Sequence, residues 1–266
     1  MNNTHRHEPA SWGSAVFYSP NCNVLFVMPS PLTGIRMGKF LRKSLDIAGF
    51  SVVVSLVQLI LLVRQIDYTY TPSRASRASY YAFVTQAVYD SYICLINMTA
   101  MFMYDDLFFP FGAATVFAFI LLLFSGKYLV FLHDAHWPGL RNHTPGRHDL
   151  TKLYIRMFFI MTGGIFVIYL YAGNNSFWPT AAIWLLTFFL SSSWVFQIVH
   201  NIARGTNHGV RAEYMVGSTV LRLMLPLYAF GCPNNIFFFD TTPALWMLCS
   251  WVGVQVSVLL SQDLFG

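Results

Sequence analysis

The stretch VRQIDYTYTPSRASRASYY, residues 63–81, joins two apolar runs in this chain. It carries three arginines, Arg64, Arg74 and Arg77. Each flanking run is near 20 residues long, and about 20 apolar residues cross the roughly 30 Å of hydrocarbon in a bilayer. The sequence therefore predicts a short, exposed loop between two transmembrane helices.

The composition indicates that the whole chain belongs in a membrane. Of 266 residues, 56% are hydrophobic and 10% are charged, whereas about 25% are charged in an average soluble domain. The net charge of +5 comes from the connections between apolar runs and indicates no nucleic-acid partner. The sequence contains no glycine-rich phosphate loop, nucleophile elbow or HExxH motif, so no catalytic residue is predicted.

Seven runs have the length and apolar character of a membrane span. The predicted fold class is an all-α membrane protein, a bundle of about seven transmembrane helices with a short N-terminal β-like remnant. The sixth run is short and contains Arg222 and Pro226, so a re-entrant or kinked segment is an alternative there. Three serines, residues 191–193, are expected to allow close helix packing in the fifth run. The seven runs cover approximately residues 44–63, 80–103, 107–126, 153–172, 177–199, 214–231 and 243–261.

The basic residues predict the orientation, because short cytosolic loops retain Lys and Arg. These residues occur in the 64–79, 127–152 and 200–213 connections, whereas the alternate connections contain neither. With seven spans, the N-terminus is predicted to be lumenal and the C-terminus cytosolic. The basic segment GIRMGKFLRK, residues 34–43, opposes this assignment, and the three alternating connections must outweigh it.

The first 35 residues are predicted to form a non-cytosolic tail, separate from the transmembrane domain at residues 36–266. VFYSPNCNVLFVM, residues 16–28, has the pattern of two short strands around a Pro-Asn turn. Two such strands are too small for an independent domain. We therefore interpret the tail as the remnant of a larger lumenal domain.

The cysteines and histidines predict no metal site and no cofactor in this chain. The four cysteines form no CxxC pair and no cluster with zinc spacing. A membrane di-iron oxidoreductase would gather histidines on its cytosolic face, but only His133 and His136 stand one helical turn apart. The histidines are therefore interpreted as residues of solvated polar loops. The residues concerned are Cys22, Cys94, Cys232 and Cys249, then His133, His136, His143 and His148 in one predicted loop, and His200 and His208 in the next.

Polar side chains inside the apolar runs are a sharper signal, because such groups are costly in a membrane and often functional. Gln86, Asp90 and Asn97 fall on one helical stripe of the second run, interrupted by Ile93. This polar stripe can line a pathway, or it can join helices through hydrogen bonds. Asp90 lies about 15 Å and Arg222 about 12 Å from the cytosolic ends of their runs, so we expect these two residues to pair.

The opening stretch and the run after it resemble a known family, the transmembrane RING-type E3 ubiquitin ligases of endomembranes, which include the fungal Tul and Dsc ligases and plant relatives. The similarity extends from about residue 15 to the end of the chain, through LFFPFGAATVFAFILLLF (107–124) and WVGVQVSVLLSQDLFG (251–266). The matching residues in the family-motif loop are Arg64, Gln65, Tyr68, Thr69, Thr71, Pro72 and Ser73, and those in the second run are Gln86, Ala87, Asp90, Tyr92 and Cys94.

The resemblance implies a ligase activity that this polypeptide is not expected to carry out alone. Members of the family begin with a lumenal domain and end with a cytosolic RING, whose eight Cys and His ligands hold two zinc ions and whose surface docks a ubiquitin-loaded E2. This chain stops at Gly266, where that tail would continue. Zinc is therefore expected only if a RING follows.

The predicted function is that of the membrane domain of a RING-type E3 ligase in the ubiquitination and quality control of membrane proteins. Its place would be the endomembrane system, in the Golgi, endosome or endoplasmic reticulum. Expected partners are the lipid bilayer, other membrane subunits of a ligase complex, membrane-protein substrates and, through a RING, an E2 enzyme and ubiquitin. The polar stripe would then hydrogen-bond polar transmembrane segments of substrates, or simply join helices. Alternatives are a RING-less scaffold or substrate-recognition subunit, a polytopic transporter, and an oxidoreductase that uses the histidines.

Overall fold

The computed structural model describes residues 16–19, 24–27, 37–103, 105–136, 177–206, 208–232, 235–236 and 241–265, with isolated helical positions between residues 151 and 166. Its described elements are helices apart from one hairpin, which confirms the predicted fold class. The hairpin consists of β1 (Val16–Ser19) and β2 (Val24–Val27), which pair antiparallel with Phe17 opposite Phe26. Both predicted strands are therefore present.

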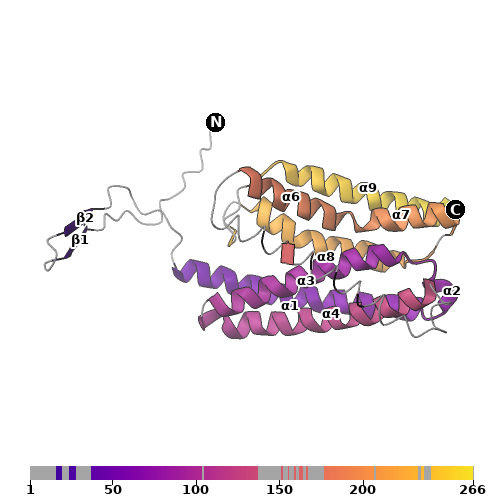
Figure 1. Ribbon diagram of the computed structural model, residues 1–266, viewed down its shortest axis with the longest axis horizontal. Coiled ribbons are helices and arrows are strands. Elements are labelled where there is room, and N and C mark those ends of the chain that lie inside the picture. Colours follow the sequence, from indigo (N-terminus) through magenta and orange to yellow (C-terminus); the bar gives the residue numbers. More distant parts are fainter. Residues whose placement is uncertain are drawn as a thin grey trace.

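The long helices form two layers that follow the order of the chain (Figure 1). One layer contains α1 (Met37–Tyr68), α3 (Tyr80–Met103) and α4 (Phe108–His136), and the other contains α6 (Phe177–Ser191), α7 (Ser193–Arg204), α8 (Ala212–Gly231) and α9 (Ala244–Phe265). The layers meet where α1 packs on α8 and α3 packs on α7. The short helix α2 (Pro72–Ala75) lies at the same end of the bundle as the end of α9, and η1 (Asp105–Leu107) connects α3 to α4.

Aromatic rings join the two layers in the core. Phe83 of α3 makes an edge contact with Tyr128 of α4, with 4.8 Å between ring centroids, and stacks on Tyr214 of α8 at 5.7 Å. Trp194 of α7 contacts the same Tyr214 at 6.3 Å. These four side chains are buried, so α8 is anchored against both α3 and α7.

Six of the seven predicted spans coincide with described helices. The fourth, residues 153–172, lies outside the described residues except for isolated helical positions. By length and composition, four described segments can cross a membrane: Gly38–Tyr68, Asp105–His136, Ala181–Arg204 and Ala244–Phe265. Helices α3 and α8, which carry Asp90 and Arg222, are not among these four, so the count of seven stays a prediction.

The fifth predicted span is not one continuous helix, contrary to expectation. Helix α6 ends at Ser191 and α7 begins at Ser193, while Ser192 departs from helical geometry. Helix α9 supplies hydrogen bonds at this break: Trp251 Nε1 donates to Ser192 Oγ at 2.9 Å, and Gln255 Nε2 donates to the Ser191 carbonyl at 3.4 Å. The break is therefore tolerated, because polar groups of a neighbouring helix bond to the Ser192 hydroxyl and the Ser191 carbonyl there.

Helix ends also differ from the predicted limits. Helix α4 continues ten residues beyond the predicted end at 126, and α7 continues five beyond 199. The predicted end of α4 was too early because Lys127 ends the apolar run in the sequence. A helix can continue beyond the hydrocarbon of the bilayer, where apolar residues are not required. Helix α7 ends at Gly205, which adopts the left-handed conformation (φ 59°) that glycine tolerates best.

Candidate functional site

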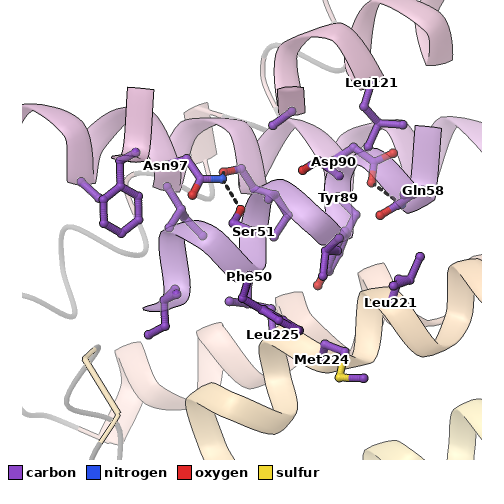
Figure 2. Close-up of a pocket in the computed structure, with 18 of the residues that line it drawn as sticks. Phe50, Ser51, Gln58, Tyr89, Asp90, Asn97, Leu121, Leu221, Met224 and Leu225 are labelled. Atoms are coloured by element: carbon purple, nitrogen blue, oxygen red, sulfur yellow. Dashed lines mark hydrogen bonds between the residues drawn. The ribbon is translucent and has the colours of Figure 1, made fainter. Parts of the chain in front are cut away.

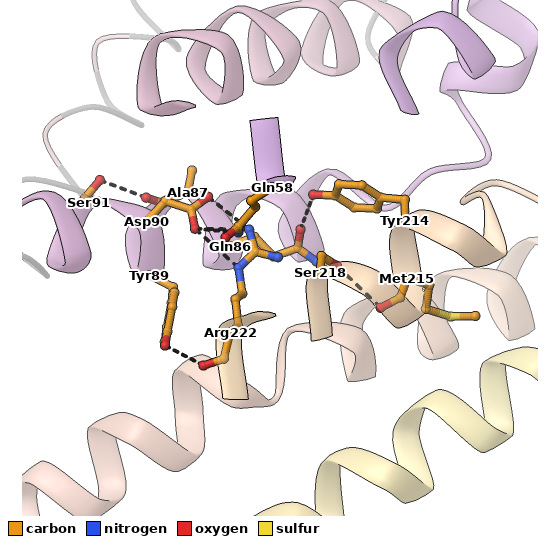
Figure 3. Close-up of polar contacts among 10 residues, drawn as sticks. All are labelled: Gln58, Gln86, Ala87, Tyr89, Asp90, Ser91, Tyr214, Met215, Ser218 and Arg222. Atoms are coloured by element: carbon orange, nitrogen blue, oxygen red, sulfur yellow. Dashed lines mark hydrogen bonds and ion pairs between the residues drawn. The ribbon is translucent and has the colours of Figure 1, made fainter. Parts of the chain in front are cut away.

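The predicted pair of Asp90 and Arg222 is present, near the middle of α3 and α8 (Figure 3). Arg222 Nη2 lies 2.9 Å from Asp90 Oδ2 and 3.1 Å from Oδ1, and its Nε lies 3.3 Å from Oδ1. The Asp90 side chain is 3% exposed and that of Arg222 is 12% exposed. Removing one member of a buried ion pair typically costs about 3–5 kcal/mol, because the other charge loses its partner.

Gln58 of α1 adds a third helix to this pair. Its Nε2 donates a hydrogen bond of 3.0 Å to Asp90 Oδ1, and the Gln58 side chain is buried. The carboxylate thus accepts bonds from both α1 and α8 while it sits on α3. Sequence analysis did not single out Gln58, although a glutamine in an apolar run is the kind of residue that hydrogen-bonds between spans.

The backbone of Arg222 is held from α3 as well. Pro226 lies four residues after Arg222 in α8 and has no N–H, so the Arg222 carbonyl lacks its usual helical donor. The Tyr89 hydroxyl donates to this carbonyl at 2.7 Å. Tyr89 and Asp90 therefore bind the main chain and the side chain of one residue. The spacing of Arg222 and Pro226 was a signal in the sequence that a donor from another helix was required.

The remaining residues of the polar stripe contact other helices. Tyr214 of α8 donates to Gln86 Oε1 at 2.8 Å, and Asn97 Nδ2 donates to Ser51 Oγ of α1 at 3.0 Å. All three stripe residues are buried. The structure thus gives each of them a partner on a neighbouring helix.

The family-motif loop is exposed at Arg64, Thr71, Pro72 and Ser73, as predicted, but two of its polar residues are buried. Helix α1 runs through to Tyr68, and Gln65 and Thr69 are fully buried. Gln65 bridges to the α7–α8 connection, where it accepts from the Arg211 N–H at 2.9 Å and donates to the Gly209 carbonyl at 3.4 Å. The Thr69 and Tyr128 hydroxyls are 2.9 Å apart. A polar sequence predicted exposure, but these polar groups are buried because they bond to one another across helices.

Other motif residues shape and fasten the same connection. The Tyr68 hydroxyl donates to the His208 carbonyl at 3.1 Å. Pro72 opens α2 directly after Thr71, as the fixed φ of proline favours, and the Ser73 carbonyl accepts from Ser76 Oγ at 3.0 Å. Arg64 lies 3.7 Å from the Glu213 carboxylate, and both side chains are largely exposed, so this pair adds little stability.

A chain of amides continues from this connection to α9. Gln197 of α7 accepts from the Ser79 N–H at 2.6 Å and donates to the Arg77 carbonyl at 3.0 Å and to Asn201 Oδ1 at 2.7 Å. Asn201 Nδ2 in turn donates to Gln262 Oε1 at 3.0 Å. Sequence analysis missed these residues, although Gln197 and Asn201 are one helical turn apart on a single face.

Three of the six histidines were placed wrongly by the sequence. His133 and His136 lie in the last turns of α4, and His200 lies in α7, so these three are helical and partly buried instead of solvated loop residues. The His136 and His200 rings lie 5.4 Å apart between centroids. His208 lies exposed in the α7–α8 connection, and His143 and His148 lie outside the described residues. Within the described part of the chain, no group of three or more His, Cys, Asp or Glu residues could hold a metal ion.

Comparisons with known proteins identify the family. Residues 38–266 match the model of the transmembrane E3 ligase/DUF2921 transmembrane domain. The transmembrane E3 ubiquitin-protein ligase FLY2 of Arabidopsis thaliana is 34% identical over 242 residues, which cover 88% of this chain and 41% of that protein. FLY1 of the same plant is 32% identical, with the same coverage. The DSC E3 ubiquitin ligase complex subunit 1 of Schizosaccharomyces pombe is 24% identical over 97% of this chain and 45% of its own length.

The chain spans less than half the length of these curated relatives, and no solved structure matches it. The family match nevertheless includes every long helix described above and all the residues of the polar network. The chain belongs to the transmembrane E3 ubiquitin ligase family, and residues 38–266 correspond to the transmembrane domain of that family.

Proposed function

We propose that this chain is the membrane-embedded part of a ubiquitin ligase that acts on membrane proteins of the endomembrane system. The observation that carries the proposal is the family match over residues 38–266. Relatives over this region are named as transmembrane E3 ubiquitin-protein ligases and as subunits of DSC ligase complexes. Ubiquitin transfer itself would come from a zinc-binding RING that docks an E2, either in a continuation of the polypeptide or in a partner subunit.

The bundle would serve as the frame that holds the ligase in the membrane. Polar contacts, two of them partly buried, fasten the end that contains α2, the α7–α8 connection and the end of α9. The Lys and Arg distribution supports a cytosolic position for this end and a lumenal position for the N-terminus. Whatever follows α9 would then leave the membrane at a fixed place on the side where ubiquitin is available.

The polar stripe has two proposed roles, substrate recognition and helix joining. The contacts of Gln86, Asp90 and Asn97 with Tyr214, Arg222 and Ser51 favour helix joining, because each side chain already has a partner within the bundle. We therefore assign the stripe chiefly to assembly of α1, α3 and α8. Substrate contact would then depend on polar groups that the bundle leaves without partners.

The test is a ubiquitination assay on the complex as it exists in membranes. A tagged chain is isolated in mild detergent from cells of its source and supplied with E1, a panel of E2 enzymes, ubiquitin and ATP. We expect ubiquitin chains on copurifying membrane proteins, and loss of this signal when zinc is chelated. A chain isolated with a separate RING subunit indicates a scaffold, whereas complete absence of ligase activity and of a RING partner contradicts the proposal.

A transporter is the second candidate, because the break at Ser192 and the buried pair of Asp90 and Arg222 are features that also occur at transport sites. A transporter requires solute flux by this chain alone. The purified chain in proteoliposomes, loaded with ions or small solutes, gives this measurement. Flux that disappears in the Asp90→Asn variant would favour transport over the ligase assignment.

A further inference from the structure

The middle of the bundle offers little to a polar ligand. A cavity of about 80 Å³ lies there between α1, α3, α4 and α8 (Figure 2). Figure 2 shows Asp90 bonded to Gln58 and Asn97 bonded to Ser51, so these polar groups serve contacts within the bundle. The basic side chains around α2, at one end of the bundle, differ because their charges are not balanced by such contacts.

Three exposed arginines surround the turn that follows α2. Arg74 lies in α2, and the Arg77 N–H donates to the Arg74 carbonyl at 3.1 Å. Residues three apart in such a helical turn are neighbours on its surface. Arg204, the last residue of α7, reaches the same turn, because its Nη1 donates to the Ser76 carbonyl at 3.3 Å. Helix α7 therefore brings a third guanidinium beside the other two.

Within the part of the chain that the structure describes, no carboxylate forms an ion pair with these three arginines. Arg74 Nη1 donates to the Tyr68 carbonyl at 3.5 Å, and its guanidinium lies over the Tyr68 ring. Carbonyl groups accept hydrogen bonds but leave the positive charge in place. The described acidic side chains at this end pair with other residues or, for one of them, with none: Asp134 with His133, Glu213 with Arg64 and Arg211, Asp263 with His208, and Asp67 unpaired.

An exposed apolar surface adjoins the three arginines. In the last turns of α7, Val199 and Ile202 are 58% and 70% exposed. At the start of α3, Tyr81 is 58% exposed, and its ring centroid lies 6.4 Å from that of Phe196 in α7. Tyrosine is enriched where the hydrocarbon of a bilayer meets its headgroups. The arginines therefore lie at the end of a lipid-facing surface, at the level of the headgroups.

The charge and the apolar surface together select the class of ligand. A lipid can place an acyl chain on the exposed face of α7 and its headgroup beside Arg77 and Arg204. The guanidinium fork binds two phosphate oxygens at once. A phosphate monoester has a charge of about −1.5 to −2 near pH 7, whereas a phosphate diester has a single negative charge. Several unbalanced guanidiniums therefore favour the monoester.

We propose that Arg74, Arg77 and Arg204 form a binding site for the phosphate monoester headgroup of a membrane lipid, whose acyl chain lies on α7 beside Tyr81. This site goes beyond the proposed function and does not depend on it. A bound lipid joins α2 to the end of α7 through its phosphate. The lipid composition of the membrane then influences how firmly this end of the bundle is held.

The test measures lipid binding to the purified full chain in detergent by native mass spectrometry. The probes are dioleoyl phosphatidic acid, which is a monoester, and dioleoyl phosphatidylglycerol, which is a diester with the same acyl chains. We expect phosphatidic acid to bind severalfold more tightly. Each basic residue near an anionic lipid surface contributes about fivefold in affinity, so Arg77→Gln combined with Arg204→Gln should weaken phosphatidic acid binding by about 25-fold.

The matched control is Arg64→Gln combined with Arg211→Gln. It removes the same charge from the same end of the bundle, but both of its arginines contact Glu213. This control should weaken phosphatidic acid binding by much less. Arg77→Lys combined with Arg204→Lys keeps the charge without the fork, so it should reduce the preference for phosphatidic acid over phosphatidylglycerol.

The substituted side chains are exposed, and His200 Nε2 also lies 3.1 Å from the Ser76 carbonyl. The variants should therefore fold, as circular dichroism and elution volume can verify, and the lysine variant gives the same answer if the glutamine variant does not. Equal weakening by both double glutamine variants would show only a general attraction to basic residues and would overturn the proposal. Equal affinity for the two lipids would overturn it as well.

Two further arms test the source of the phosphate and the place of the acyl chain. Glycerol 3-phosphate carries the same monoester without acyl chains and should bind far more weakly than phosphatidic acid. Equally tight binding would identify a soluble phosphate compound as the ligand and contradict a lipid site. Phosphatidic acid with a photoreactive acyl chain should crosslink to α7 between Phe196 and Ile202, and crosslinks spread evenly over the bundle would refute this position.

Discussion

Replacing Tyr89 by phenylalanine tests how α3 holds α8 at its proline. In the structure the Tyr89 hydroxyl donates to the Arg222 carbonyl at 2.7 Å, and Pro226 has no N–H with which to serve that carbonyl. Tyr89→Phe therefore leaves a carbonyl without a donor inside the bundle. Pro226→Ala supplies the missing N–H from within α8 and makes the hydroxyl unnecessary.

The structure allows the size of this effect to be estimated. An unsatisfied buried polar group costs about 1–3 kcal/mol, whereas interhelical hydrogen bonds in membranes average about 0.6 kcal/mol because the separated helices also find partners. The Arg222 carbonyl has no alternative donor in its own helix, so we place the cost of Tyr89→Phe at about 1–2 kcal/mol. In the Pro226→Ala background the same substitution should cost about 0.5 kcal/mol or less.

The free energy of unfolding of the chain in bicelles, measured by steric trapping, provides the comparison. Tyr70 is 79% exposed, so Tyr70→Phe is the matched control and should change this free energy little. The decisive quantity is the coupling between positions 89 and 226, expected at about 1 kcal/mol. If Tyr89→Phe is equally costly with and without Pro226→Ala, the argument that the hydroxyl replaces a helical donor is refuted.

Three further variants test other contacts of the bundle by the same measurement. Asp90→Asn should lower the free energy of unfolding by about 3–5 kcal/mol, because Arg222 keeps its charge and loses its partner. Adding Arg222→Met should recover about 2 kcal/mol. A double variant no more stable than Asp90→Asn would contradict the pairing. Gly209→Ala should cost about 1–3 kcal/mol, because its Cβ would clash with the Arg77 carbonyl and lie 2.9 Å from the Ala78 nitrogen. Gly253→Ala, whose Cβ meets nothing within 4 Å, is the control and should be neutral or slightly stabilising. Equal effects of the two substitutions would argue against the close approach at Gly209. Gln197→Leu removes the hydrogen-bond partner of the Ser79 N–H and of the Arg77 carbonyl. It should lower the free energy of unfolding by about 2 kcal/mol and make amide exchange at Ser79 faster. Unchanged exchange would show that Gln197 does not hold the connection between α2 and α3.

Apolar length predicted most of the helices, because the bilayer sets how many residues a span requires. Counting residues from the expected membrane surface also predicted the pair of Asp90 and Arg222, since the two charges fall at similar depth on their helices. The depth of a residue in the membrane can be counted along its own helix from the sequence alone. Contacts that depend on depth alone could therefore be predicted.

Partners that depend on the rotation and order of helices could not be predicted in this way. The sequence gives Gln86 and Asn97 the same stripe, but only the packing sends one to Tyr214 of α8 and the other to Ser51 of α1. The break at Ser192 was also missed, because the apolar run continues through it and its stabilising donor, Trp251, comes from α9. The burial of Gln65 within the motif loop was also missed, because composition does not show that this side chain bonds to a connection about 145 residues away.

The family-motif loop fastens the end of α1 to the connection between α7 and α8. Through Gln65 and Tyr68 it holds the α7–α8 connection at Arg211 and His208. The His208 N–H donates in turn to Asp263 in the last turn of α9 at 3.1 Å. The beginning and the end of the transmembrane domain are thus joined through one short connection. Because this network holds the end of α9, we propose that the motif orients any segment that follows α9.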